Sequence, residues 1–139
     1  MVLRKHIALF VAGGLRYLWA LPCTLVGLAF ALCASRMGAR VTRRRGVLEV
    51  QGPGVGRLVD ALAPPGCRIR ALTLGHVVLA RDAGALEGTR GHEATHVRQY
   101  ERWGPAFLPA YVIAGVVAGL RGGDSYRDSI FERSTPSPR

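Results

Sequence analysis

Two histidines and a glutamate lie within one short stretch of the chain. His92, Glu93 and His96 form an H-E-x-x-H pattern in a segment that is expected to be helical. Residues four apart lie on one face of a helix, so His92 and His96 can offer two imidazole nitrogens to one metal ion. Glu93 follows the first histidine directly, where its carboxylate can reach a water held by that ion. Two ligands and a base in this spacing indicate a zinc-dependent hydrolase.

The helix that carries these residues is expected to begin near Thr89, a residue type that caps helix N-termini, and to run to about Arg102. Gly104 and the proline after it would end the helix. Gln99 shares a face with the two histidines, which makes it a candidate to hydrogen-bond one of them.

A catalytic zinc ion takes three protein ligands and keeps one open position, so a third ligand must come from elsewhere in the chain. No histidine follows His96, and the candidates are four downstream carboxylates and two earlier histidines: Glu101, Asp124, Asp128, Glu132, His6 and His76. An acidic ligand from a later helix is the simpler choice. The residues alone leave the choice among the four carboxylates open, and Asp128 is the fallback if Glu132 is not the ligand.

The run RGHEATHVRQYERWGPAF…AY, followed by YRDSIFER, resembles the gluzincin class of zinc metallopeptidases, in particular small bacterial membrane-associated HExxH proteins. The resemblance covers roughly residues 73–133. It implies that Glu132, which follows a phenylalanine, is the third zinc ligand. The chain departs from the family pattern at Ser129, where asparagine is usual, and at residues 133–136, which replace an acidic residue and alanine.

The N-terminal part of the chain contains a long apolar run. Residues 17–34 (YLWALPCTLVGLAFALCA) carry no charge and are just long enough to cross the hydrocarbon core of a bilayer. We expect an uncleaved membrane span; a cleaved signal peptide and a buried core helix are the alternatives. Five arginines follow the run, against three basic residues before it. The positive-inside rule then places the rest of the chain in the cytoplasm, and the resemblance to bacterial proteins implies the inner membrane of a bacterium.

The remaining pattern predicts an α+β fold, with an N-terminal membrane helix followed by a small zincin-like domain. Residues 46–51 alternate as in a strand and end at Gly52-Pro53-Gly54, which predicts a turn. Residues 69–80 are rich in β-forming residues, and residues 107–120 form a second apolar run that is expected to be buried or to rest on a membrane. The expected organisation is a basic-flanked membrane anchor (1–45), a metallopeptidase domain with a short sheet, the H-E-x-x-H helix and C-terminal helices (46–133), and a disordered tail (134–139).

Charge and cysteine content exclude two other classes of protein. The formal net charge is +10, and the first 45 residues hold eight basic residues and no acidic one. These basic residues flank an apolar run and do not alternate with exposed aromatic residues, so we expect no nucleic-acid partner. The three cysteines are Cys23, Cys33 and Cys67; their spacing indicates buried thiols, neither a disulfide framework nor a cysteine zinc site.

The function expected from the sequence is hydrolysis of peptide bonds in a peptide or protein substrate. Glu93 would act as the general base toward a water activated by Zn²⁺. A further group must stabilise the oxyanion, and His76, Tyr111 and Tyr126 are the candidates. Residues 72–79 could pair with an extended substrate as an edge strand.

Two other readings of the same sequence stay open. The chain could be a catalytically degenerate membrane protein that keeps a zincin-like fold and acts through partner binding. It could also be a small membrane protein in which the H-E-x-x-H pattern is accidental. The intact Glu93 favours the enzyme, because a purely structural metal site has no need of a base. The sequence assigns no oligomeric state.

Overall fold

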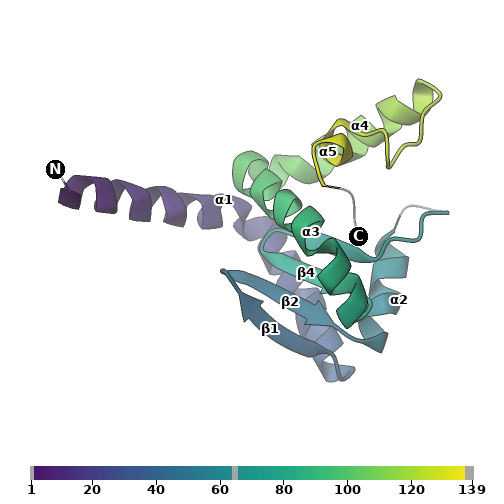
Figure 1. Ribbon diagram of the computed structural model, residues 1–139, viewed down its shortest axis with the longest axis horizontal. Coiled ribbons are helices and arrows are strands. Elements are labelled where there is room, and N and C mark those ends of the chain that lie inside the picture. The colour runs from purple at the N-terminus through teal and green to yellow at the C-terminus, as the bar shows by residue number, and fades with distance from the viewer. Residues whose placement is uncertain (1, 64–65, 137–139) are drawn as a thin grey trace.

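A computed structural model of the chain describes residues 2–63 and 66–136. It shows an α+β protein in which a long apolar N-terminal helix leads into a small four-stranded mixed sheet (Figure 1). The expected fold class is confirmed at this level.

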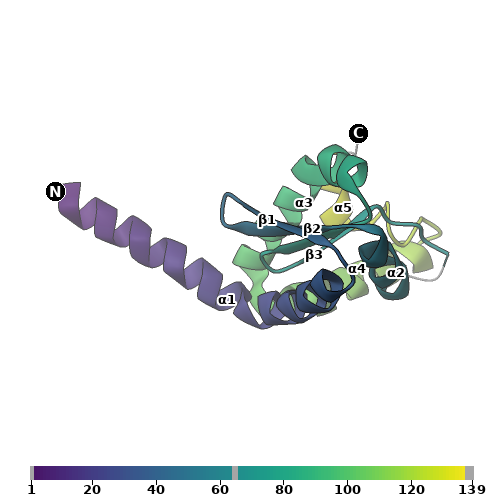
Figure 2. The same ribbon diagram turned by 90° about the horizontal axis from the view of Figure 1, so that it is seen from below.

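Helix α1 (Val2–Arg36) has two parts with different surroundings. Its first part projects from the molecule, and its second part lies along the sheet (Figures 1 and 2). One stripe of the second part is buried: Ala20, Cys23, Ala31 and Ala34. The opposite stripe is apolar as well, and Leu18, Leu25 and Leu32 are each more than half exposed. The run expected to be a free membrane span is therefore packed against the rest of the protein along one side.

Gly75 allows α1 to approach the sheet closely. This residue has φ +60°, and a Cβ atom placed on it would lie 2.6 Å from the backbone nitrogen of Thr24 in α1. Any other residue type would push the helix away and would also be strained at this φ. The contact holds the turn that joins two strands against α1.

The sheet contains β1 (Arg40–Arg44), β2 (Val47–Gln51), β3 (Ala71–Leu74) and β4 (Val77–Ala80), in the order β1-β2-β4-β3. The β1–β2 and β3–β4 pairs are antiparallel, and β2–β4 is parallel. The β-rich run at 69–80 thus folds back on itself around Gly75 and His76. Much of the arginine cluster expected to belong to the anchor forms β1, an edge of the sheet, and the expected boundary between residues 45 and 46 falls in the β1–β2 turn.

The sheet is covered on both faces, and β4 shows how its residues are divided. Val77 and Leu79 pack with α1 and with α2 (Pro53–Leu62), whereas Val78 and Ala80 pack with Leu86 of α3 (Ala83–Trp103). The turn expected at residues 52–54 is instead the start of α2. Proline fits there because the first turn of a helix has no intrahelical partner for its N–H groups.

Helix α3 begins six residues before the expected Thr89. Asp82 caps it, and the Asp82 carboxylate accepts a 2.7 Å hydrogen bond from the backbone N–H of Ala85. Thr89 lies inside the helix and donates its hydroxyl proton to the carbonyl oxygen of Ala85. Gly104 ends α3 as expected and leads into the short 3-10 helix η1 (Gly104–Ala106).

The C-terminal part consists of α4 (Phe107–Leu120), an irregular connection and α5 (Ile130–Arg133). Only the first residue of α4 is buried, and Val112, Ile113 and Leu120 are each at least 60% exposed. Of the two expectations for this run, burial in a core is therefore wrong. Of the expected C-terminal helices, the last is the single turn of α5.

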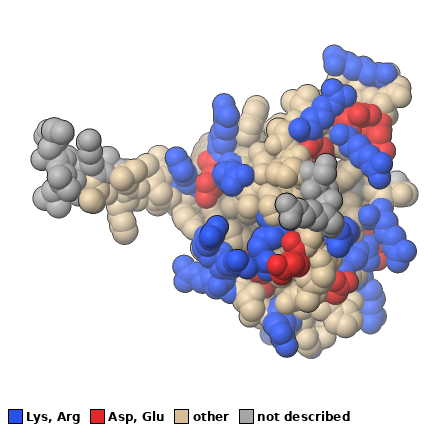
Figure 3. Space-filling view, in the orientation of Figure 1, with Lys and Arg blue, Asp and Glu red and all other residues tan. Residues whose placement is uncertain are grey.

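Among the residues that the structure describes, two stretches are long and apolar enough to cross a membrane: Leu9–Arg36 in α1, and Ala83–Leu120, whose apolar part is α4. In the projecting part of α1 most side chains carry no charge, whereas arginines and acidic residues gather over the body (Figure 3). The three cysteines are free; Cys23 is buried as expected, but Cys33 is exposed.

Candidate metal centre

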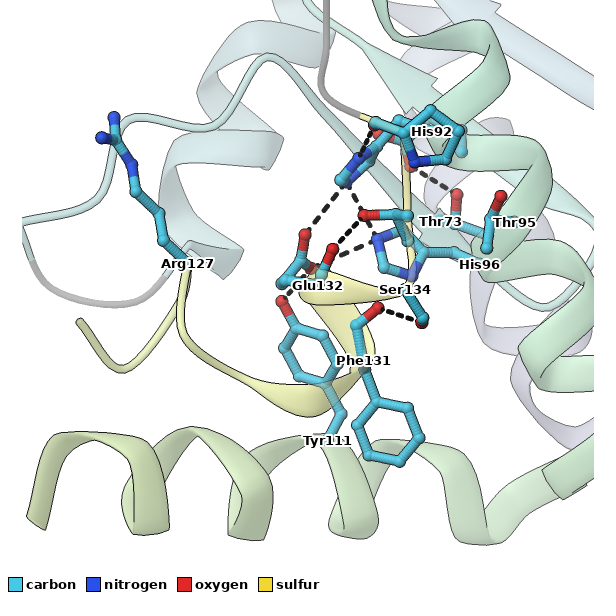
Figure 4. A network of polar contacts seen from close by, with 12 residues as sticks. Thr73, His92, Thr95, His96, Tyr111, Arg127, Phe131, Glu132 and Ser134 are labelled. Atoms are coloured by element: carbon cyan, nitrogen blue, oxygen red, sulfur yellow. Dashed lines mark hydrogen bonds and ion pairs between the residues drawn. The ribbon is translucent and has the colours of Figure 1, made fainter. Parts of the chain in front are cut away.

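Two helices bring three potential ligands together. His92 and His96 lie on the buried face of α3, and Glu132 reaches them from α5 (Figure 4). The Nε2 atoms of the two histidines are 3.1 Å apart, and the Glu132 carboxylate oxygens lie 3.2 Å from His92 Nε2 and 3.3 Å from His96 Nε2. All three side chains are buried, and together they could hold a metal ion.

The hydrogen bonds behind the histidines fix which ring nitrogen carries the proton. His92 Nδ1 lies 3.0 Å from the carbonyl oxygen of Pro136, which can only accept, so Nδ1 is the donor. Gln99 donates through its Nε2 to the carbonyl oxygen of Phe131, and this orients its Oε1 toward His96 Nδ1 at 2.8 Å. His96 Nδ1 is therefore also the donor.

It follows that both neutral histidines turn an unprotonated Nε2 toward the Glu132 carboxylate. Three electron-pair donors then face one another at hydrogen-bond distance in a buried site. Such a group is stable only when a cation lies between its members, either a proton or a metal ion.

Tyr111 of α4 holds Glu132 in place. Its hydroxyl donates a 2.6 Å hydrogen bond to Glu132 Oε1. Burial by itself would raise the pKa of Glu132, but the contacts with His92, His96 and Tyr111 outweigh burial and hold this pKa at about 2. The carboxylate is therefore charged at neutral pH, as a metal ligand must be.

Glu93 is buried beside this group, on the side of the sheet. Thr73 of β3 donates a 2.6 Å hydrogen bond to Glu93 Oε2. Within β3, Thr73 points to the face of the sheet that α3 covers, and so reaches the helix. A carboxylate removed from water takes up a proton more readily than an exposed one, which is the property of a general base.

Two cavities flank the site, and Glu93, Glu132 and Tyr126 line both. One has a volume of about 190 Å³ and is mostly apolar, with Leu72 and Leu108 in its wall. The other has a volume of about 490 Å³, and its wall is polar and apolar in nearly equal parts. Burial raises the pKa of Tyr126, so its hydroxyl stays protonated and can donate a hydrogen bond into either cavity.

The structure places the other candidate residues elsewhere. His76 lines neither cavity; it stacks on Tyr17, with ring centroids 4.0 Å apart, and its Nε2 lies 3.0 Å from Glu101 Oε1. Asp124 accepts hydrogen bonds from the backbone N–H groups after it, and Asp128 accepts one from the Asp124 N–H.

His6, the other early histidine, lies on an exposed position near the start of α1. Gln99, Tyr111 and Tyr126 do lie at the site. Tyr111 contacts the candidate ligand Glu132 and also lines the smaller cavity.

Two groups at the site were not expected from the sequence. The sequence signal for Thr73 is that it is the one polar residue of an otherwise apolar strand, β3. The structure shows that its side chain is buried. The carbonyl of Pro136 offered no such signal, since every residue carries a carbonyl. It also shows that the expected disordered tail begins with residues that contact the site, while residues 137–139 lie outside the described part of the chain.

Replacing Gln99 by leucine tests the role of this side chain. The change removes the acceptor that orients His96, and we expect metal affinity to fall by about 10- to 100-fold. Competition with a chromophoric chelator measures it. Arg98→Leu, at the exposed neighbouring position, is the control and should leave the affinity unchanged. Equal affinities for wild type and Gln99→Leu would contradict the assigned role.

Comparison with known proteins adds no relative. No family model matches this chain, and neither a curated protein nor a solved structure matches it.

Proposed function

We propose that this chain is a zinc-dependent peptidase in which Glu93 is the general base. One observation carries the proposal: His92, His96 and Glu132 turn ligand atoms toward one point, beside a buried carboxylate that is not one of them. The resemblance to gluzincins supports the same assignment of residues.

The donor set and its spacing fit zinc. Two imidazole nitrogens and one carboxylate, with a fourth position left open, are a ligand set of catalytic zinc sites. Ligand atoms placed tetrahedrally at about 2.0–2.1 Å from one ion lie roughly 3.3 Å from one another. The separations in this protein are 3.1, 3.2 and 3.3 Å. Little movement is then needed to accept the ion.

Each residue around the site has a task in peptide hydrolysis. Bound zinc would lower the pKa of a water from about 15.7 toward about 7. Glu93 accepts the proton of the attacking water and passes it to the leaving nitrogen, while Thr73 keeps its carboxylate in position. The Tyr111 hydroxyl already donates its hydrogen bond to Glu132. We therefore assign the stabilisation of the oxyanion to the hydroxyl of Tyr126.

The position of β3 supports a peptide as the substrate. It is an edge strand, and within residues 2–63 and 66–136 no strand pairs with its outer side. Ala71, Leu72 and Thr73 of this strand line the cavity next to Glu93. An extended peptide that pairs with β3 would lay its backbone across the site, gaining affinity from main-chain hydrogen bonds.

The apolar surfaces support attachment to a membrane. The projecting part of α1 and the outer face of α4 both expose large apolar side chains. We propose that α1 anchors the protein in a bacterial inner membrane, with the site on the cytoplasmic side, as the arginines after residue 34 suggest.

The direct test is hydrolysis by the purified full chain in detergent. Zinc-loaded protein should cleave a quenched fluorescent peptide library, a chelator should abolish the cleavage, and added zinc should restore it. Zinc binding without cleavage would favour the alternative, a metal protein that acts by binding a partner.

Glu132→Ala tests the third ligand, with Asp128→Ala as the control. We expect zinc retention after gel filtration to fall strongly in Glu132→Ala and to stay near wild type in Asp128→Ala. The reason is that Glu132 contacts both histidines, whereas Asp128 contacts the backbone of Asp124 and the guanidinium of Arg133. Unchanged zinc content in Glu132→Ala would move the ligand elsewhere.

A further inference from the structure

The larger of the two cavities at the site has a basic rim. Three arginines line it: Arg68 and Arg70 precede β3, and Arg127 follows α4. They come from two separate segments of the chain and border the same cavity as His92 and Glu132. In Figure 4 the Arg127 side chain lies to one side of Glu132, away from Tyr111.

Two of these arginines have no fixed partner in the part of the chain that the structure describes. The Arg68 and Arg127 guanidinium groups make neither a hydrogen bond nor an ion pair there; Asp60 and Asp124 are close enough for their pKa values to be lowered by Arg68 and Arg127, respectively. Arg70 donates to the carbonyl of Gly84. Guanidinium groups on a cavity rim are well suited to hold a carboxylate.

The charges of the site itself do not neutralise this rim. Besides the arginines, the charged residues that line the cavity are Glu93 and Glu132. These two carboxylates balance one divalent ion: two negative charges against two positive. Arg68 and Arg127, whose guanidinium groups make no ion pair within the described residues, then leave positive charge on the rim, and the cavity attracts anions. The cavity on the other side has no lysine or arginine in its wall, so the two sides of the site differ in charge.

From this arrangement we propose that the enzyme selects substrates with an acidic side chain, Asp or Glu, close to the scissile bond, which Arg68 and Arg127 bind in the larger cavity. The inference rests on the proposed peptidase function, because it names the substrate class of that same site. The smaller, apolar cavity takes the residue on the other side of the bond.

The test measures binding and cleavage separately, so that the two proposals can fail independently. Binding is measured with the full chain in detergent, zinc-loaded and carrying Glu93→Gln. The probes are two blocked peptide libraries. One carries Asp and Glu at the varied positions, and the other carries Asn and Gln at the same positions. We expect about tenfold tighter binding of the acidic library at low salt, with the difference shrinking as salt is added. Wild-type protein should cleave the acidic library faster by a similar factor.

Three variants decide whether the rim is responsible. Arg68→Glu/Arg127→Glu should remove or invert the preference, and Arg68→Lys/Arg127→Lys should keep it, because the positive charge is retained. Arg43→Glu/Arg44→Glu is the control: it makes the same change in net charge on β1, at the opposite edge of the sheet from β3, and should leave the preference intact. Zinc content shows that each variant keeps its site.

Equal binding of the two libraries overturns the inference, and so does a preference that survives Arg68→Glu/Arg127→Glu. This holds whether or not peptides are cleaved. A binding preference that the charge reversal removes, without cleavage by wild type, would support the basic cavity as a ligand site and reject the peptidase function.

Discussion

Glu93→Gln should retain zinc at the wild-type level and lose peptide hydrolysis by about 10²- to 10⁴-fold in kcat. Glutamine has nearly the same shape, and the Thr73 hydroxyl can still donate to its side-chain oxygen, so the surroundings change little. What disappears is the group that takes a proton from the attacking water. Zinc content and initial rates on the same preparation measure both effects.

A carboxylate elsewhere on α3 provides the control for this variant. Glu101→Gln changes a residue that contacts His76, on the side of the helix that faces α1, and should leave hydrolysis within a few-fold of wild type. Parallel loss of zinc and activity in Glu93→Gln would mean that Glu93 maintains the site and is not a dedicated base.

His96→Ala should reduce bound zinc from about one ion per chain to none detectable. The histidine supplies one of three protein ligands, and the two that remain cannot compete with water and buffer for the ion. Metal analysis of detergent-purified protein after extensive dialysis gives the result. Hydrolysis should be lost together with the zinc.

His76→Ala is the matched variant for this experiment. His76 is a buried histidine like His96, but it lies in the β3–β4 turn and contacts Thr24, Glu101 and Tyr17. Its removal should lower thermal stability and leave zinc content unchanged. Retention of zinc in His96→Ala would exclude this residue as a ligand and would require another explanation for the convergence of the three side chains.

The two candidate histidine ligands could be predicted from the sequence because their spacing determines how they lie relative to one another on a helix. Two histidines four residues apart must share a helix face, whatever the rest of the fold. Local spacing does not identify Glu132 in the same way, because it lies 36 residues after His96 on a helix that is only one turn long. In the structure Tyr111 provides the support that a longer helix would give. A contact between residues 21 positions apart cannot be inferred from local patterns.

The limits of the elements were harder to predict, for identifiable reasons. Glycines at positions 84, 88 and 91 lower the helix propensity of the first half of α3. The cap at Asp82 and the packing of Leu86 against the sheet stabilise the helix despite this low propensity. Pro53 marks turns as often as helix starts, and only burial of Val55 and Val59 under the sheet decides between them. The arginines of β1 are typical of a solvated linker, but pairing with β2 makes them a strand.

Helix α1 both projects from the molecule and covers one face of the sheet, so it cannot be removed without exposing part of the core. Ala31 and Ala34 of this helix belong to the same core cluster as Val50 and Leu79 of the sheet. A protease that cut between α1 and β1 would not release a finished soluble domain, because the remaining domain would expose the sheet face that α1 had covered. The site therefore stays wherever α1 resides.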